Sequence, residues 1–125
     1  MRIYIAASYP RKDEAIRLST ALSNKKNNIV SSWLFANEEG YSINENKEDK
    51  IKRMRKCAIR DLKEIKYCDM LVCFTGDNLT HGGRHTELGA ALALGKRVVI
   101  IGKEESVFHY HPYVIAYKTI EEFLK

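Results

Sequence analysis

Short apolar runs alternate along this chain with longer stretches of helical periodicity, and this alternation limits the possible folds more than any other feature. The runs that suit strands are 1–7, 29–35, 69–74, 97–102 and 113–117. The stretches that suit helices are 11–26, 47–67, 84–94 and 119–125. Strands that alternate with helices form a parallel sheet with helices on both faces. The pattern therefore predicts an α/β fold.

The number of strands and the length of the chain narrow this fold class further. A chain of 125 residues can bury one core of its own, so we predict a single domain over 1–125. Five strands in such a domain suit a flavodoxin-like (Rossmann-like) sheet with the order 2-1-3-4-5, whose ligands bind beyond the carboxyl ends of the strands. The segments 7–11, 75–87 and 103–111 should meet at that edge.

Composition excludes several classes of function. The chain is 45% hydrophobic and 30% charged, as soluble globular domains are. No apolar run approaches the roughly 20 residues of a membrane span, and no signal peptide is visible, so a cytoplasmic protein without a membrane partner is expected. The three cysteines lack a C-x-x-C spacing, which favours reduced thiols over a disulfide or a metal site.

The net charge of +5 comes largely from the stretch 47–66. Acidic residues interleave with the basic ones there, which indicates the solvated face of a long helix. A nucleic-acid interface would also place aromatic or groove-reading elements beside the basic face, and none is visible, so no nucleic-acid polymer is expected as a partner. A basic surface still attracts small anionic metabolites such as nucleotides.

The stretch 81–94, HGGRHTELGAALAL, carries the strongest indication of chemistry. Gly82 and Gly83 precede an alanine-rich helix, and Glu87 is expected in its first turn. Free backbone N–H groups and a partial positive charge at a helix start would keep this carboxylate ionised and available as a nucleophile. The glycines would let a ligand approach the backbone. Neither a Walker loop nor a G-x-G-x-x-G fingerprint is present, and a plain tight turn is the alternative.

A second carboxylate, Asp61, lies beside an apolar stripe on the helix 47–67. The stripe consists of Ile51, Met54, Ala58, Leu62 and Ile65. Asp61 follows Ala58 by three residues and precedes Ile65 by four, which places it on the same side of the helix. The alternative to a functional role is a salt bridge to a base elsewhere in the fold. A partner on the same helix is less expected, because the positions three and four residues away hold no base.

The histidines and two large aromatic residues have competing interpretations. His81 and His85 could meet across one helical turn, but no carboxylate or thiol completes a usual metal set, and no metal is expected. Trp33 and Phe108 suit the core or its rim as well as stacking on a base.

Several segments together resemble the nucleoside 2-deoxyribosyltransferase family, which includes the 2′-deoxynucleoside 5′-phosphate N-hydrolases. The matching segments are Tyr4 to Ser8, Arg60-Asp61-Leu62, Cys68 to Val72, Gly82 to Lys96 and Val107-Phe108-His109. The resemblance spans nearly the whole chain. Its most specific parts are the D-L-x-x-I-x-x-x-D run and the glycine–Glu–Leu–Gly–x–Ala helix start.

The resemblance implies cleavage of the N-glycosidic bond of deoxynucleosides or their 5′-monophosphates, without a metal or organic cofactor. Glu87 matches the family's nucleophile, which forms a covalent ester with the sugar, as in retaining glycosidases. Asp61 matches the carboxylate that assists protonation of the leaving base, and a part-buried aspartate could keep the raised pKa that this role needs. Tyr4 matches a tyrosine that positions the nucleophile.

The resemblance also implies substrate-binding residues and an assembly. Ser8 falls where relatives bind a 5′-phosphate, and His81 and Arg84 could join it in gripping that group. The expected substrate-binding set is Ser8, Arg11, His81, Gly82, Gly83, Arg84, Phe108 and His109. The loop 103–112 matches a segment that often completes a neighbouring subunit's site, so a homodimer or larger homo-oligomer is implied.

The chain departs from the family pattern at His81, where transferases carry an aspartate and phosphohydrolases a serine. Its short C-terminus also removes residues with which longer transferases contact the base. Transfer to another base and hydrolysis by water therefore both stay open, as do the base and the 5′ group of the substrate. The alternatives are a catalytically silent nucleotide sensor on the same fold and an unrelated flavodoxin-like binding protein.

Overall fold

The structure, a computed structural model, describes residues 1–36, 45–78 and 82–125. Within these ranges the sheet holds five parallel strands in the order β2-β1-β3-β4-β5, which confirms the predicted fold class. The strands are β1 (Arg2–Ala6), β2 (Asn28–Ile29), β3 (Met70–Phe74), β4 (Arg97–Ile101) and β5 (Val114–Tyr117). The α-helices are α1 (Lys12–Asn24), α2 (Lys47–Tyr67), α3 (Gly83–Ala93) and α4 (Ile120–Leu124). The 3-10 helices are η1 (Tyr9–Arg11), η2 (Ser32–Leu34) and η3 (Val107–Tyr110).

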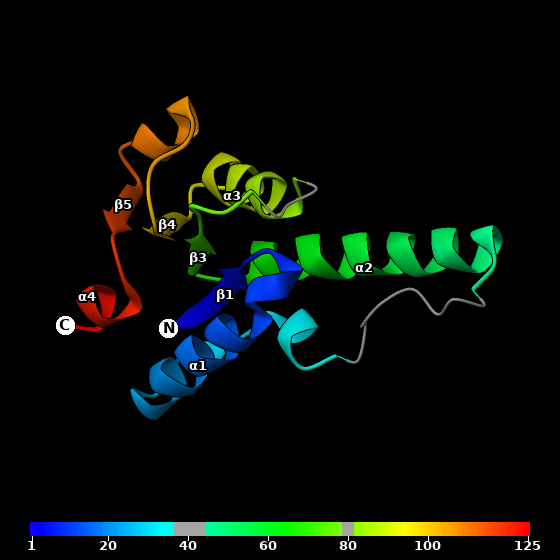
Figure 1. Ribbon diagram of the computed structural model, residues 1–125, viewed down its shortest axis with the longest axis horizontal. Helices are drawn as coiled ribbons and strands as arrows, with labels where there is room; N and C mark the ends of the chain where they lie inside the picture. Colours follow the sequence, from blue (N-terminus) through cyan, green and yellow to red (C-terminus); the bar gives the residue numbers. More distant parts are fainter. Residues whose placement is uncertain (37–44, 79–81) are drawn as a thin grey trace.

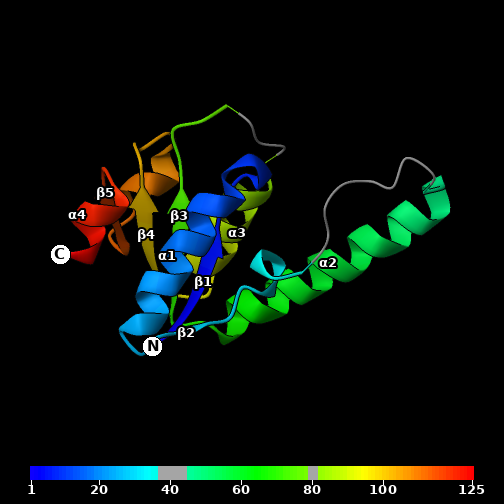
Figure 2. The same ribbon diagram turned by 60° about the horizontal axis from the view of Figure 1, so that its bottom comes forward.

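Helices cover both faces of the sheet (Figure 1, Figure 2). α1 and α4 lie on one face, and α2 and α3 lie on the other. The central strands β1, β3 and β4 are buried from their second residue onward. Strands covered on both faces have continuous apolar sequences, which explains why the sequence pattern located them.

The second strand is much shorter than the sequence suggests. A strand over 29–35 is the prediction, but β2 ends at Ile29 and the 3-10 turn η2 follows, so this prediction is wrong. Side chains replace the strand pairing at Ile5 of β1: its N–H donates to Ser31 Oγ at 3.0 Å, and its carbonyl accepts from Trp33 Nε1 at 2.7 Å. Because both backbone groups are satisfied, this part of β1 needs no strand partner on that edge.

α2 is the longest of the described helices, and its N-terminal half extends away from the sheet (Figure 1). Asn46 caps it by accepting a hydrogen bond from the Asp49 N–H at 2.8 Å. Of the predicted apolar stripe only Ile65 is buried, whereas Met54 and Leu62 are 44% and 49% exposed. Most of the stripe therefore faces outward in a single chain. None of the described helices combines the length and the apolar character needed to cross a membrane.

The loops that follow β1, β3 and β4 meet at the carboxyl edge of the sheet, as predicted. Thr75 donates its hydroxyl to the Lys103 carbonyl at 2.7 Å, and the Thr75 carbonyl accepts from Arg11 Nη1 at 2.8 Å. Gly102 has a φ of +134°, and a Cβ there would lie 2.4 Å from Thr75 Oγ1. Only glycine therefore allows the ends of β3 and β4 to approach this closely.

The cysteines are free thiols, as the sequence predicts. Cys68 and Cys73 are buried, and Cys57 is partly buried. Burial raises the pKa of Cys73 to about 12, so its thiol stays protonated and packs as a small apolar group.

Candidate active site

The helix α3 begins at the glycine pair. Gly82 has a φ of +94°, a left-handed conformation that glycine adopts without steric cost, and it caps the helix that starts at Gly83. Its carbonyl accepts hydrogen bonds from the N–H and the hydroxyl of Thr86, at 3.0 and 3.2 Å. Glu87 is the fifth residue of α3, so the prediction that places it in the first turn is wrong. The open N–H groups of the helix start therefore do not govern its ionisation.

Tyr4 holds Glu87 instead. Tyr4 lies on β1, is fully buried, and donates a hydrogen bond from Oη to Glu87 Oε2. Burial raises the pKa of Glu87 to about 7, and the charge of Asp61 adds to the rise, while the hydrogen bond from Tyr4 opposes it. Burial and the charge of Glu87 raise the pKa of Tyr4, which stays protonated and remains a donor. The site thus contains a glutamate that titrates near neutral pH beside a fixed hydroxyl.

Asp61 of α2 interacts electrostatically with the same pair, and its charge raises the pKa of both Tyr4 and Glu87. Its Oδ1 accepts hydrogen bonds from Arg60 Nε at 3.1 Å and Nη2 at 2.8 Å. Burial raises the pKa of Asp61, and Arg60 opposes that rise. The basic partner of Asp61 is thus its neighbour on α2, so the expectation of a base elsewhere in the fold is wrong. The charge of Asp61 also raises the pKa of Glu87.

Glu64 belongs to this site, although sequence reasoning missed it. Its Oε1 accepts from the Ser32 N–H at 3.1 Å, which ties α2 to η2. Its charge raises the pKa of Glu87, Asp61 and Tyr4. The spacing of three residues between Asp61 and Glu64 on one helix was the signal that could have found it. We call Tyr4, Asp61, Glu64 and Glu87 the acidic site.

Carboxylates grouped in this way suit a reaction that needs both a nucleophile and a proton donor. Because the pKa of Glu87 is raised to about 7, this carboxyl group is partly protonated at neutral pH. Burial favours the protonated form of both Glu87 and Asp61, whereas the hydroxyl of Tyr4 and the guanidinium of Arg60 favour the ionised forms. Retaining glycoside cleavage uses two neighbouring carboxyl groups, one as nucleophile and one as proton donor.

A second group of polar side chains lies at the carboxyl edge of the sheet. We call it the edge cluster; it consists of Ser8, Arg11, Asp77 and Arg84. Three donors reach one oxygen, Asp77 Oδ2: Arg84 Nη1 at 2.7 Å, Arg11 Nη1 at 3.0 Å and Ser8 Oγ at 3.4 Å. Sequence reasoning singled out the three donors but missed the acceptor. The signal for Asp77 was its place in the loop after β3, which the fold class directs to this edge.

Arg84 is the most deeply placed member of the edge cluster. It is only 2% exposed, and its Nη1 also donates to the Phe74 carbonyl at 3.0 Å. Its Nη2 donates to the Asp77 carbonyl at 2.9 Å. A buried guanidinium is tolerated only with such partners, so Asp77 is part of the reason why Arg84 can lie here.

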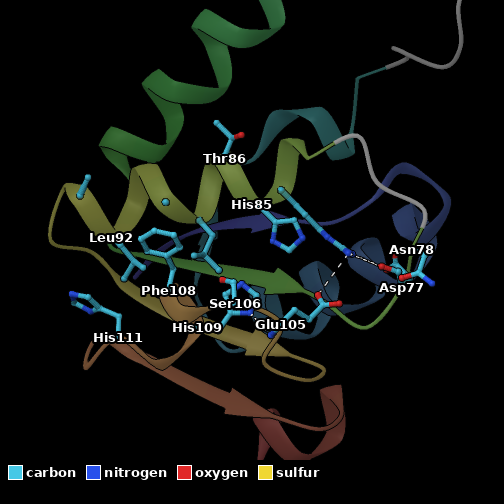
Figure 3. Close-up of a pocket in the computed structure, with 14 residues that line it drawn as sticks. Asp77, Asn78, His85, Thr86, Leu92, Glu105, Ser106, Phe108, His109 and His111 are labelled. Atoms are coloured by element: carbon cyan, nitrogen blue, oxygen red, sulfur yellow. Dashed lines mark hydrogen bonds and ion pairs between the residues drawn. The ribbon is translucent and has the colours of Figure 1, made fainter.

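Phe108 and His109 of η3 line a cavity of about 870 Å³ between α3 and η3 (Figure 3). The opposite wall is formed by α3 residues that include His85 and Leu92. The rings of His85 and His109 stack with centroids 5.6 Å apart. Glu87 is two positions after His85, about half a turn around the helix, so the cavity and the acidic site lie on different sides of α3.

His109, which lines this cavity, carries a buried ring nitrogen. It is 3% exposed, and its Nδ1 accepts from the Glu105 N–H at 2.9 Å, so the ring proton belongs on Nε2. Burial lowers the pKa of His109, which keeps the ring neutral. Within the described part of the chain, Nε2 is buried and has no hydrogen-bond partner.

The predicted site residues thus fall into three places. The catalytic set meets at the acidic site. Ser8, Arg11 and Arg84 meet at the edge cluster, beside the glycines that start α3. The two predicted residues of η3 line the cavity, which Arg84 and Asp77 of the edge cluster also line. His81 lies outside the described residues.

Comparison with known proteins supports this fold. No protein-family model matches the chain, and no curated protein sequence matches it. The CMP N-glycosidase BcmB of Clostridium botulinum superposes with a TM-score of 0.64 at 22% identity, over 99% of this chain and 95% of that chain. A 2-deoxyribosyltransferase from Bacillus psychrosaccharolyticus gives a TM-score of 0.74 at 18% identity, over 100% of this chain and 91% of that chain. A conserved protein from Enterococcus faecalis V583 gives 0.63 at 15% identity, over 99% of this chain and 94% of that chain.

At these identities the likeness establishes the fold. Two of the three structures are a deoxyribosyltransferase and a nucleotide N-glycosidase, so the resemblance drawn from the sequence is confirmed at the level of the fold.

Proposed function

We propose that this protein cleaves the N-glycosidic bond of deoxynucleosides or their 5′-monophosphates through a covalent glycosyl ester on Glu87. The observation that carries the proposal is the hydrogen bond from buried Tyr4 to Glu87, within reach of the charge of Asp61. The fold adds support, because the similar structures include a CMP N-glycosidase and a 2-deoxyribosyltransferase.

In the first step, ionised Glu87 attacks the anomeric carbon of the sugar. A bond forms between C1′ and a carboxylate oxygen while the C1′–N bond to the base breaks, and the electron pair of that bond goes to the base nitrogen. Asp61 assists the transfer of a proton to the departing base. The transition state resembles an oxocarbenium ion, so the negative charge of Glu87 also stabilises it. Tyr4 orients the attacking carboxylate throughout.

In the second step, the ester on Glu87 is resolved. Water or another base attacks C1′, the C1′–O bond to Glu87 breaks, and the glutamate leaves as a carboxylate. Asp61, ionised after the first step, accepts the proton that the incoming group releases. Water gives hydrolysis and a second base gives transfer. The chemistry is therefore the same for both outcomes, and only the acceptor differs.

An assay of base release tests the proposal. Purified protein is incubated with each common 2′-deoxynucleoside and its 5′-monophosphate, with and without a free acceptor base. Free base without an acceptor indicates hydrolysis, and an exchanged nucleoside indicates transfer. A nucleophile is confirmed by mass spectrometry if quenched protein carries one pentosyl group on the peptide that contains Glu87. Tight binding without turnover would contradict the proposal and favour a nucleotide sensor.

We also propose that the protein forms a homodimer or larger homo-oligomer in which the loop 103–112 of one copy completes the site of another. Two observations support this. The apolar stripe of α2 faces outward, with Leu62 49% exposed. Phe108 is 63% exposed beside the cavity.

Complementation between two inactive variants tests the shared site. Glu87→Gln removes the nucleophile, and Phe108→Ala removes a ring from the loop of the other copy. In a dimer with shared sites, mixing the two variants after subunit exchange should restore about a quarter of the wild-type activity per chain. Light scattering measures the assembly directly. A fully active monomer would contradict this proposal and leave the proposed reaction intact.

A further inference from the structure

The charge balance of the edge cluster bears on which end of a substrate it can hold. Among the described residues, its two arginines face two partly buried carboxylates, Asp77 and Glu105, whose Oε1 lies 3.9 Å from Arg84 Nη2. A third carboxylate, the more exposed Glu14, accepts from Arg11 Nη2 at 3.1 Å. The arginines therefore bring no surplus positive charge. A phosphate dianion placed on these guanidinium groups would lie among carboxylates that already neutralise them.

The edge cluster adjoins the acidic site through two elements. Arg84 and Glu87 are three residues apart on α3, the spacing of neighbours on a helix surface. Ser8 follows β1, the strand that carries Tyr4. In the proposed reaction the base lies toward Asp61 on α2, because the base receives its proton there. The other end of the pentose then lies toward the carboxyl edge of the sheet, where Asp77 is held.

We infer that Asp77 makes this site selective for an uncharged 5′-hydroxymethyl end, so that deoxynucleosides are preferred to their 5′-monophosphates. The inference rests on the proposed function. A 5′-hydroxyl group donates to a carboxylate and leaves the three donors on Asp77 in place, whereas a phosphate dianion only accepts and is repelled by Asp77. The three donors that could have gripped a phosphate are instead directed at Asp77 Oδ2.

The ratio of kcat/KM for a deoxynucleoside to that for its 5′-monophosphate tests the inference. For the base that the protein prefers, wild-type protein should favour the nucleoside on the order of tenfold or more. Asp77→Asn keeps the shape of the side chain and removes its charge, so this ratio should fall on the order of tenfold. A wild-type preference for the monophosphate, or an unchanged ratio in Asp77→Asn, would overturn the inference.

Binding separates this inference from the proposed function. Calorimetry with Glu87→Gln compares the affinities for the same two ligands without turnover. Tighter binding of the nucleoside sustains the inference even if no base is released by wild-type protein. Tighter binding of the monophosphate, or no binding of either ligand, overturns it even if catalysis is found. The affinity and kcat/KM comparisons in wild-type protein and in Glu87→Gln do not depend on Asp77→Asn. They therefore test the inference even if Asp77→Asn weakens the fold around Arg84.

Glu14→Gln is the matched control. It also removes a carboxylate that is bonded to Arg11, but Glu14 lies on α1 with its side chain 46% exposed. Screening by solvent makes its charge weak at the site, so the ratio should change by less than about twofold. A change as large as that in Asp77→Asn would mean that overall charge, and not Asp77, sets the preference.

Discussion

The acidic site and the edge cluster contain the same kinds of side chain but treat negative charge in opposite ways. At the edge cluster, Asp77 meets two guanidinium groups at 2.7 and 3.0 Å. At the acidic site, Glu87 meets the hydroxyl of Tyr4, and burial raises its pKa to about 7. The difference teaches that the partner of a partly buried carboxylate decides whether it stays a fixed anion or titrates near neutral pH.

Replacement of Glu87 should have the largest effect on activity. Glu87→Gln leaves no oxygen able to form the ester, so base release should fall on the order of 10⁴-fold or more. The amide keeps the size of the side chain, and circular dichroism should show an intact fold. Activity close to that of wild type would contradict the role of Glu87.

The same variant tests the raised pKa through stability. Free glutamate ionises near pH 4.5 and Glu87 near pH 7, so the folded chain binds the extra proton between these values. The resulting stabilisation is complete below pH 4.5 and is lost as the pH rises through 7, with a total of about 3 kcal/mol. Glu87→Gln should therefore melt several degrees higher than wild type at pH 8, and the gap should close near pH 4.5. An equal difference in melting temperature at pH 4.5 and at pH 8 would contradict the raised pKa of Glu87.

Removing the proton donor should have the next largest effect. Asp61→Asn should lower kcat by about 10²- to 10⁴-fold, the usual contribution of a general acid. The loss should be much smaller with 4-nitrophenyl 2-deoxyriboside, whose leaving group needs no proton. Equal losses with both substrates would mean that Asp61 positions the sugar and does not supply the proton.

The edge cluster should respond in stability more than in chemistry. Arg84→Met removes a buried cation and leaves Asp77 with one guanidinium fewer, so unfolding should become easier by about 3 kcal/mol. Denaturant titration measures this change. Arg11→Met is the comparison variant. Because Arg11 is less buried, its replacement should lower the free energy of unfolding by less. Equal losses of unfolding free energy in the two variants would mean that the burial of Arg84 is unimportant.

The smallest effect is expected at Tyr4. Tyr4→Phe removes the hydrogen bond that favours ionised Glu87, so the pKa of Glu87 should rise further. The acidic limb of the pH–rate profile should therefore move to higher pH, and kcat at pH 7 should fall by about tenfold. A profile that moves to lower pH would show that the hydroxyl group does not stabilise the carboxylate.

The sequence alone predicted the strand order of the sheet and a candidate catalytic set. Apolar runs and helical periodicity are local properties, and the connection rules for parallel strands turned them into the strand order. α2 has the bounds that its sequence predicts. Tyr4, Asp61 and Glu87 were found through the resemblance, and their predicted roles await the experiments above.

Only the tertiary structure decided how each charge behaves. Asp77 gathers Ser8 and Arg11 from positions 69 and 66 residues away, and Tyr4 meets Glu87 across 83 residues. The short β2 likewise results from Ser31 and Trp33 reaching Ile5 across 26 and 28 residues. Burial and the choice of partner depend on such distant contacts, which neither local spacing nor periodicity contains. The pKa of Glu87 and the neutralised edge cluster therefore became visible only once the chain was folded.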